Sequence, residues 1–408
     1  MGKRTRSVAV DATAMRQTNS ALVLRLIWES KQMSRADLAR VTGLSASTVS
    51  DIINELRDHD LVVEQGAGAS SGGRRPIMLG VNPSRSHIIG IEIGGTHITI
   101  VATSLVGDIL CSRRVDNPTR KEPSETLARL HRLIQWCFEQ PGVDRKGLLG
   151  LGVAVPSPVR PDSPGRMSRL VLPEWTGVDL LAELKGKYHR PVFVENDANA
   201  GALAELWWSE RDDLRDLAYV KVATGIGAGF IIDGKLYRGA DGSAGEIGHL
   251  SIDPNGAECV CGSRGCLTTI IGTLAIIEQA SGRVTLNSGA PVRSIHDIVE
   301  ATMEGDRAAR ELIEEVGTSL GIALAGLLNT LNPRVVVLGG EITELGDILF
   351  DPLRVALRTQ ALFSSVARTS IVASRLGTYA IAVGAAALVL DAALNDLDLF
   401  PPVTAGAA

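Results

Sequence analysis

Apolar residues near the start of the chain recur at helical spacing. In residues 19–31, NSALVLRLIWESK, Leu22, Leu26 and Ile27 fall on one face, which predicts a first helix capped by the Asn-Ser pair at its start. A Ser-x-x-Asp capping box then predicts a second helix, with Gly43 suited to end it. The residues expected on the inner face of the second helix are Leu38, Ala39 and Val41.

A third helix, SASTVSDIINELRDH, follows the glycine turn, and Ser45 is placed to cap it. Its inner face is expected to hold Val49, Ile52, Ile53 and Leu56, while its outer face is small and polar. A short helix, a glycine turn and such a helix are typical of a helix-turn-helix, whose second helix lies in the major groove of DNA. A structural helical hairpin without DNA is the alternative interpretation. The expected DNA contacts are Ser45, Ser47, Thr48, Ser50 and Asn54.

Two short strands are predicted next, at residues 61–65 and 74–81, on either side of the segment GAGASSGG. This arrangement is typical of the wing of a winged helix. Arg74 and Arg75, beside glycines that permit a close approach, are expected to reach phosphates or a narrow minor groove. A solvated linker between domains is the alternative. We therefore predict a DNA-binding domain over residues 1–82.

Beyond residue 83 the chain alternates strands, glycine turns and helices, which indicates the α/β class. Residues 87–104 and 217–236 each predict two strands joined by a tight glycine turn, and each is followed by further strands and helices. The repetition predicts a duplicated unit with a ligand cleft between its halves. The expected boundaries are a ligand-binding and dimerisation domain at 83–408, with a smaller lobe at 83–195 plus the C-terminal helix and a larger lobe at 196–379.

Charge and composition narrow the class of protein. Of 408 residues, 45% are hydrophobic, which is enough for several buried cores. The net charge is −5, but residues 1–85 carry 12 lysines and arginines against 8 acidic residues, so the front is basic and the remainder acidic. The apolar runs at 320–331 and 380–390 are shorter than the roughly 20 residues of a membrane span, and the N-terminus lacks a secretory apolar core. We expect a cytoplasmic protein without a membrane span.

A possible metal site is the most specific chemical signal. His249, Cys259, Cys261 and Cys266 offer one imidazole and three thiolates within 18 residues, a set that suits a structural tetrahedral zinc ion. Free thiols in a glycine-rich loop are the alternative. Glu246, three residues before the histidine, is expected near this loop, where it could accept hydrogen bonds from a polyol.

Three glycine turns after predicted strands are candidates for holding phosphate, because their backbone N–H groups are unobstructed. Their members are Gly94, Gly95, Thr96, Thr224, Gly225, Gly227, Gly339 and Gly340. Asp197 ends one strand and opens a helix, so its carboxylate is a candidate base for a substrate hydroxyl; a helix N-cap is the equal alternative.

Together these segments resemble the ROK family of repressors and sugar kinases, in its regulator form with an N-terminal winged helix. The most specific match is residues 245–266, GEIGHLSIDPNGAECVCGSRGC, and residues 91–97, 194–205 and 223–231 match further family segments. The resemblance implies an actin-like, ribonuclease H-like fold of two lobes, with Asp197 as the base in an active kinase. It implies sugar binding by Asn196, Asp197, Glu246, His249, Pro156 and Ser157, with ATP and Mg²⁺ as cofactors of the kinase form.

The chain also departs from the kinase pattern. Glu92 stands where family kinases usually have Asp, Thr268 replaces a sugar-binding Glu, and Gly177 lies where many have Asn. These changes affect phosphoryl transfer more than binding, because an in-line transfer needs stricter geometry.

We therefore expect a sugar-responsive transcription factor, most simply a repressor, that binds a pseudo-palindromic operator as a homodimer or a tetramer. Two alternatives are an active ATP-dependent sugar kinase with a DNA-binding head, and a DNA-binding protein whose second module only dimerises.

Overall fold

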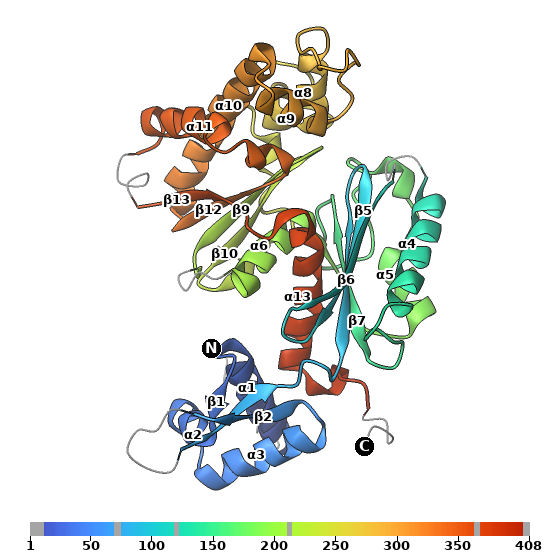
Figure 1. Ribbon diagram of the computed structural model, residues 1–408, viewed down its shortest axis with the longest axis vertical. Helices are drawn as coiled ribbons and strands as arrows, with labels where there is room; N and C mark the ends of the chain where they lie inside the picture. Colours follow the sequence, from blue (N-terminus) through green and yellow to red (C-terminus); the bar gives the residue numbers. More distant parts are fainter. Residues whose placement is uncertain (1–11, 69–74, 118–121, 210–213, 363–367, 403–408) are drawn as a thin grey trace, which may run out of the picture.

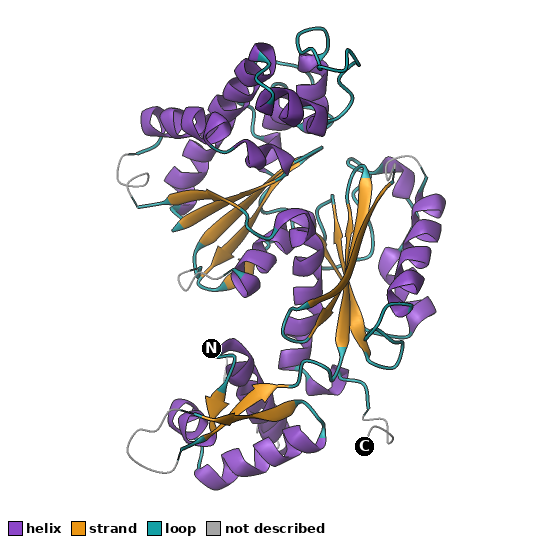
Figure 2. Ribbon diagram, viewed as in Figure 1, coloured by secondary structure: helices purple, strands orange, loops and turns teal. Residues whose placement is uncertain are grey.

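The computed structural model describes residues 12–68, 75–117, 122–209, 214–362 and 368–402. Figure 1 shows three parts: a head at the N-terminus, a first lobe built on the sheet that contains β5, β6 and β7, and a second lobe built on the sheet that contains β9, β10 and β12. In Figure 2 helices cover the outer face of each lobe's sheet, and further helices lie between the two sheets. The predicted fold of two α/β lobes preceded by a winged helix is confirmed.

The head contains three helices and a three-stranded sheet of order β1-β3-β2. Its elements are α1 (Ala12–Glu29), β1 (Met33–Ser34), α2 (Arg35–Thr42), α3 (Ala46–Asp58), β2 (Val62–Ala67) and β3 (Ile77–Val81). The predicted caps of α2 and α3 are present: the Ser34 side chain accepts the N–H of Asp37 at 3.2 Å, and Gly43 ends α2 at a φ of 72°. Ser45 likewise accepts the N–H of Thr48 at 3.1 Å. The predicted inner face of α3 is buried.

Three expectations for α1 and α2 are wrong. α1 begins at Ala12, not near residue 19, and Ser20 lies buried within it. Leu22 is 42% exposed, because Val23, Leu24 and Ile27 set the buried face of the helix instead. Val41 is 51% exposed near the end of α2. In both helices a small rotation about the helix axis moves an apolar residue from the buried face to the exposed face. The spacing of apolar residues alone does not predict such a rotation.

The first lobe is a five-stranded sheet of order β6-β5-β4-β7-β8, with α4 and α5 beside it. Strands β6, β5 and β4 run antiparallel, and β4, β7 and β8 run parallel. Its elements are β4 (His87–Ile93), β5 (His97–Ser104), β6 (Ile109–Asp116), α4 (Pro123–Phe138), β7 (Leu148–Val155), α5 (Leu180–Tyr188) and β8 (Val192–Asn196), with the short 3₁₀ helix η1 (Pro173–Trp175).

The second lobe repeats this topology. Its sheet has the order β11-β10-β9-β12-β13, again with three antiparallel strands followed by two parallel ones, which confirms the predicted duplication. Its elements are β9 (Leu217–Val222), β10 (Ile226–Ile232), β11 (Lys235–Tyr237), α7 (Leu267–Ile271), α8 (Thr273–Ala280), α9 (Ile295–Met303), α10 (Arg307–Leu331), β12 (Val335–Gly339), α11 (Asp347–Gln360) and β13 (Ser370–Ala373), with η2 (Ile247–His249), η3 (Glu341–Leu345) and η4 (Gly377–Tyr379).

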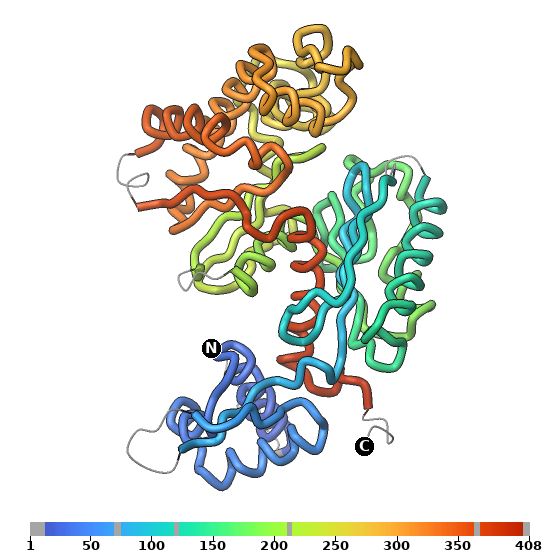
Figure 3. The backbone as a smooth tube through the Cα atoms, in the orientation of Figure 1, coloured from blue at the N-terminus to red at the C-terminus, as the bar shows by residue number. Residues whose placement is uncertain are grey.

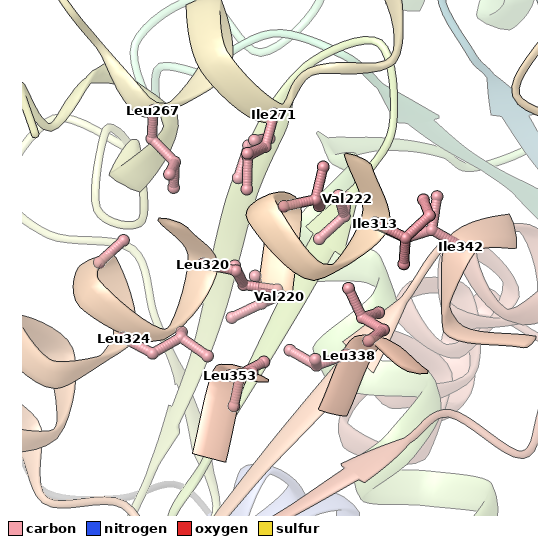
Figure 4. Close-up of a cluster of buried hydrophobic side chains, with 14 of the residues drawn as sticks. Val220, Val222, Leu267, Ile271, Ile313, Leu320, Leu324, Leu338, Ile342 and Leu353 are labelled. Carbon is pink, nitrogen blue, oxygen red and sulfur yellow. The ribbon is translucent and has the colours of Figure 1, made fainter. Parts of the chain in front are cut away.

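The core of the second lobe lies between its sheet and the helices above it. Figure 4 shows Val220 and Leu338, from adjacent strands, facing Leu320 and Leu324 of α10 and Leu353 of α11. All of these side chains are almost completely buried. Burial of a leucine contributes roughly 1.5–3 kcal/mol, so this cluster holds the two long helices on the sheet.

Two helices connect the lobes: α6 (Asp197–Trp208) and α13 (Ala380–Asn395), which is followed by η5 (Leu397–Leu399). α13 packs against α6 on one side and against the first sheet on the other, and Figure 3 shows the chain then running toward the head. The helices touch through their backbones, because a Cβ at Gly384 would lie 1.7 Å from the carbonyl oxygen of Ala200.

α13 also corrects one prediction about length. The helical segment Gly377–Asn395 has 19 residues and is apolar enough to cross a membrane by length and composition, although its central apolar run is shorter. Buried positions make up 67% of its apolar window, so it meets this test as a core helix between the two lobes.

Candidate functional site

A cavity of about 220 Å³ opens between the two lobes, at the start of α6. All the residues predicted to bind sugar line it: Pro156, Ser157, Asn196, Asp197, Glu246 and His249. Of the predicted phosphate-holding residues, Thr224, Gly225 and Gly227 also line it. The sequence prediction missed Pro158, Leu170, Val171, Lys221, Ile226, Glu258, Val260 and Thr269. The cavity therefore combines apolar walls with several convergent polar groups, as binding sites for small molecules do.

The start of α6 is fixed by a network of hydrogen bonds. Asn196 is the N-cap: its Oδ1 accepts the N–H groups of Ala198 at 2.9 Å and Asn199 at 3.2 Å. Behind it, the buried Glu195 carboxylate accepts the N–H of Asn196 at 2.9 Å and the Nε–H of Arg238 at 2.7 Å. The alternative interpretation of Asp197 as the cap is thus wrong, and its carboxylate is left for other contacts.

Asp197 makes a buried ion pair with Lys221, on the neighbouring strand β9. Lys221 Nζ also lies 4.0 Å from Oε1 of Glu92, at the end of β4, and Nε2 of His97 lies 3.4 Å from the same oxygen. The one signal in the sequence for this cluster was a lysine in the otherwise apolar strand LAYVKV.

The charges in this cluster stabilise one another. Burial alone lowers the pKa of Lys221, but the charges of Asp197 and Glu92 more than offset it, so the pKa of Lys221 is raised. Burial raises the pKa of Glu92, but its hydrogen bond with His97 and the nearby cations outweigh this effect and hold the pKa of Glu92 below its usual range. Both shifts favour the charged forms, an ammonium ion at Lys221 and a carboxylate at Glu92.

Glu246 faces the same cavity from the second lobe. Burial, with a further contribution from the charge of Asp197, raises the pKa of Glu246 to about 7. Its Oε2 lies 3.9 Å from Nε2 of His249. A carboxyl group and an imidazole so placed can exchange hydrogen bonds with the hydroxyl groups of a polyol.

The predicted metal ligands come together at the edge of the cavity. One ligand atom from each of His249, Cys259, Cys261 and Cys266 lies within 4.8 Å of the others. Nδ1 of His249 is 3.4 Å from Sγ of Cys259, and Sγ of Cys261 is 3.6 Å from Sγ of Cys266. Zinc–sulfur bonds of about 2.3 Å in a tetrahedron place sulfur atoms roughly 3.8 Å apart, so these side chains fit a zinc ion. Because His249 turns its other ring nitrogen toward Glu246, it joins the cluster to the cavity.

The remaining glycine turns lie outside the cavity lining. Gly94, Gly95 and Thr96 connect β4 to β5. Gly339 ends β12 where a Cβ would lie 1.9 Å from the Tyr219 hydroxyl oxygen, and Gly340 follows it at a φ of 124°. Close packing accounts for these last two glycines, and a role for them in phosphate binding stays a prediction. Of the departures from the kinase pattern, Thr268 lines the cavity, and Gly177 is exposed in a loop outside it.

The outer face of α3 presents the predicted DNA-contacting residues. Ser45, Ser47 and Asn54 are exposed, and Thr48 and Ser50 are partly exposed. The Ser45 hydroxyl lies 2.8 Å from those of Ser47 and Thr48, so the three form one polar cluster at the start of the helix. Ser50 donates to the carbonyl of Ala46 at 2.8 Å. Arg75 is exposed at the base of the wing, and Arg74 lies outside the described residues.

The head is docked on the lobes through α1. Trp28 of α1 donates from Nε1 to the carbonyl of Leu105 at 2.7 Å, and its ring lies 4.6 Å from that of Trp207, at the end of α6. Arg25 forms an ion pair of 2.6 Å with Asp391 of α13 and lies over the Trp207 ring. The head thus rests on the two helices that connect the lobes.

Comparison with known proteins agrees with this geometry. The sequence model of the ROK family matches residues 88–392, and a model described as winged helix-turn-helix DNA-binding matches residues 20–63. The xylose repressor of Caldicellulosiruptor bescii is 33% identical over 393 residues, covering 94% of this chain and 98% of the relative. The DNA-binding transcriptional dual regulator NagC of Escherichia coli is 33% identical over 390 residues, covering 94% and 95%.

Solved structures give the same result. A ROK family transcriptional regulator described as a homologue of the E. coli MLC protein superposes with a TM-score of 0.78 at 30% identity, covering 94% of this chain and 98% of that one. A ROK family glucokinase from Streptomyces griseus, in complex with glucose and AMPPNP, covers only 74% of this chain but 99% of its own, with a TM-score of 0.66 at 28% identity. The chain therefore belongs to the ROK family, and its winged helix-turn-helix head places it among the transcriptional regulators of that family.

Proposed function

We propose that the chain is a sugar-responsive repressor of carbohydrate utilisation genes, active in the cytoplasm. A winged helix-turn-helix attached to a polyol-sized cavity supports this proposal. So do the names of its relatives, which include a xylose repressor aligned over nearly the whole chain. The DNA partner would be a pseudo-palindromic operator, bound by a homodimer or a tetramer whose heads are related by twofold symmetry.

The observation that carries the proposal is the course of α6. Asn196 and Asp197 line the cavity at the start of this helix, and Trp207 packs on Trp28 of the head near its end. Twelve residues at 1.5 Å each span about 18 Å, so one rigid element connects the cavity to the head. A sugar that binds one position of α6 better than another would shift the surface on which the head rests.

Zinc would support the cavity in this proposal. His249, Cys259, Cys261 and Cys266 would hold the ion, which supplies folding free energy to a polar loop that has few apolar contacts of its own. The ion would also fix the His249 ring, whose other nitrogen faces Glu246. Its role is structural, because four protein ligands leave no open position for chemistry.

The test is operator binding with and without sugars. Fluorescence anisotropy would follow the full-length protein on labelled DNA from upstream of its own gene, with unrelated DNA of equal length as the control. Xylose, glucose, fructose, N-acetylglucosamine and N-acetylmannosamine form the panel. We expect specific binding without sugar and at least a roughly 10-fold loss of affinity with one of them. The absence of a specific complex under every condition would contradict the proposal.

A further inference from the structure

Lys221 is an unusual residue for its position. It lies in β9, whose six residues are all buried, and only 6% of its own surface is exposed. A buried ammonium ion is costly unless charged or polar partners replace the water that it loses. Its partners therefore show what the lysine does.

Those partners are two carboxylates that come from elements outside the sheet to which Lys221 belongs. Asp197, at the start of α6, is 5% exposed and forms an ion pair and hydrogen bond with Lys221. Glu92, at the end of the first-lobe strand β4, is 3% exposed, and its Oε1 lies 4.0 Å from the ammonium nitrogen. Lys221, from a strand of the second lobe, thus pairs with the first-lobe strand β4 and with α6, and it lines the cavity.

The same two carboxylates are the groups that an ATP-dependent kinase of this fold would need. Asp197 would have to accept the proton of a sugar hydroxyl, and the acid at position 92 would have to act on a magnesium-bound phosphate. Magnesium needs oxygen ligands at about 2.1 Å, and an ammonium ion beside both carboxylates repels such a cation. A magnesium nucleotide therefore does not fit the cluster.

The turns around this cluster are also closed against each other. A Cβ at Gly95 would lie 2.5 Å from Oγ1 of Thr224, so the first and second glycine turns touch across the lobes. Nearby, Arg114 of β6 forms an ion pair of 3.3 Å with Glu341, which follows the third turn. These contacts bring the first two turns together and join β6 to the segment that follows the third turn.

We propose that Lys221 is a specificity-determining residue: it is a built-in counter-cation for Asp197 and Glu92, and it restricts the cavity to uncharged sugars bound without a magnesium nucleotide. The restriction to uncharged sugars rests on the proposed function, whereas the exclusion of a magnesium nucleotide does not depend on it. Phosphorylated and acidic sugars are excluded because, among the described lining residues, Lys221 is the only lysine or arginine and it is already paired. The nearby Glu246 and Glu258 add only acidic groups.

The first experiment needs no variant. The wild-type protein is titrated with Mg²⁺·AMP-PNP by calorimetry and with Mn²⁺ by electron paramagnetic resonance, each with and without the sugar panel. We expect no binding of either at about 1 mM. A dissociation constant below that value for the nucleotide, or ATP turnover with any sugar, would overturn the proposal.

The second experiment changes the charge. Lys221→Thr removes the counter-cation, Lys221→Arg retains it, and Lys235→Thr is the matched control at an exposed lysine of the same sheet. We expect Lys221→Thr alone to bind Mn²⁺ at least about 10-fold more tightly than wild type. Circular dichroism checks that Lys221→Thr folds. The double variant Lys221→Met with Asp197→Asn replaces the ion pair by two uncharged side chains, and it should not bind Mn²⁺. Equal Mn²⁺ affinity of folded Lys221→Thr and wild type would overturn the proposal.

The third experiment addresses the ligand class. Thermal unfolding is measured with glucose, xylose and N-acetylglucosamine, and with glucose 6-phosphate, N-acetylglucosamine 6-phosphate and glucuronate. We expect a neutral sugar to raise the melting temperature more than its charged counterpart. A larger shift with a phosphorylated sugar would overturn the ligand class. If no sugar acts, the proposed effector function fails, while the Mn²⁺ measurement still decides the role of Lys221.

Discussion

The indole rings of Trp28 and Trp207 lie 4.6 Å apart between centroids, with their planes inclined at 51°. One ring belongs to the DNA-binding head and the other to the helix that begins at the cavity. This contact joins the DNA-binding head to the helix that lines the cavity.

Trp207→Ala is expected to uncouple sugar binding from operator binding. The variant should still bind operator DNA and sugar, but the loss of operator affinity caused by sugar should shrink at least about 5-fold, because the head no longer follows α6. Anisotropy titrations with and without sugar measure this. Trp136→Ala, on α4 of the first lobe, is the control that should keep the full response. An unchanged sugar response in Trp207→Ala would show that the coupling runs elsewhere.

Zinc should be present at one ion per chain. Cys261→Ser should lose the ion, lower the melting temperature and abolish sugar binding, because His249 and Glu246 depend on the loop for their positions. Elemental analysis, thermal unfolding and calorimetry check these effects. Cys111→Ser, outside the cluster, should retain the metal. A Cys261→Ser protein with a full complement of zinc would contradict the assigned ligands.

Asn196→Ala should act on both stability and binding. Loss of the two N-cap hydrogen bonds should cost about 1–2 kcal/mol of the free energy of unfolding. Sugar affinity should fall by at least about 10-fold, because the same residue lines the cavity. Ser294→Ala removes the comparable cap of α9 away from the cavity, so it should lower stability alone. Equal sugar affinities of the two variants would remove Asn196 from the binding site.

Arg75→Ala should weaken operator binding without changing sequence preference. An exposed arginine at the base of the wing would contact phosphate, so its loss should reduce the slope of log affinity against log salt by about 1. Asn54→Ala, on the exposed face of α3, should instead relax the preference at particular base pairs. Arg307→Ala, exposed on the second lobe, is the control for charge alone. An unchanged salt slope would place Arg75 away from the DNA.

The sequence predicted those parts of the fold that depend on neighbouring residues. Ser34 and Gly43 bound α2 as expected, since both caps bond to the backbone within a few residues. The four predicted metal ligands come together in the structure, and local sequence could indicate them because they lie in one short loop. By contrast, Leu22 was assigned to the wrong side of α1, since the packing partners of that helix come from distant segments.

The cluster around Lys221 could not be predicted from neighbouring residues, because its members also come from distant segments of the chain. Asp197 follows β8 of the first lobe, Lys221 lies in β9 of the second, and Glu92 is more than a hundred residues earlier. Only the packing of the two lobes brings them together. A charged residue in a buried strand was the available signal, and it indicated a partner without identifying it.

The position of α13 has a consequence for synthesis on the ribosome. The head is translated before the two lobes, and Asp391 of α13, which pairs with Arg25 of the head, follows that arginine by 366 residues. The helix that separates the sheet of the first lobe from α6 is made equally late. A nascent chain can therefore fold its head early, but the surface of α13 on which the head packs forms only after both lobes have been translated. A stop codon placed before α13 would spare every predicted DNA-contacting residue and should still abolish the proposed response to sugar.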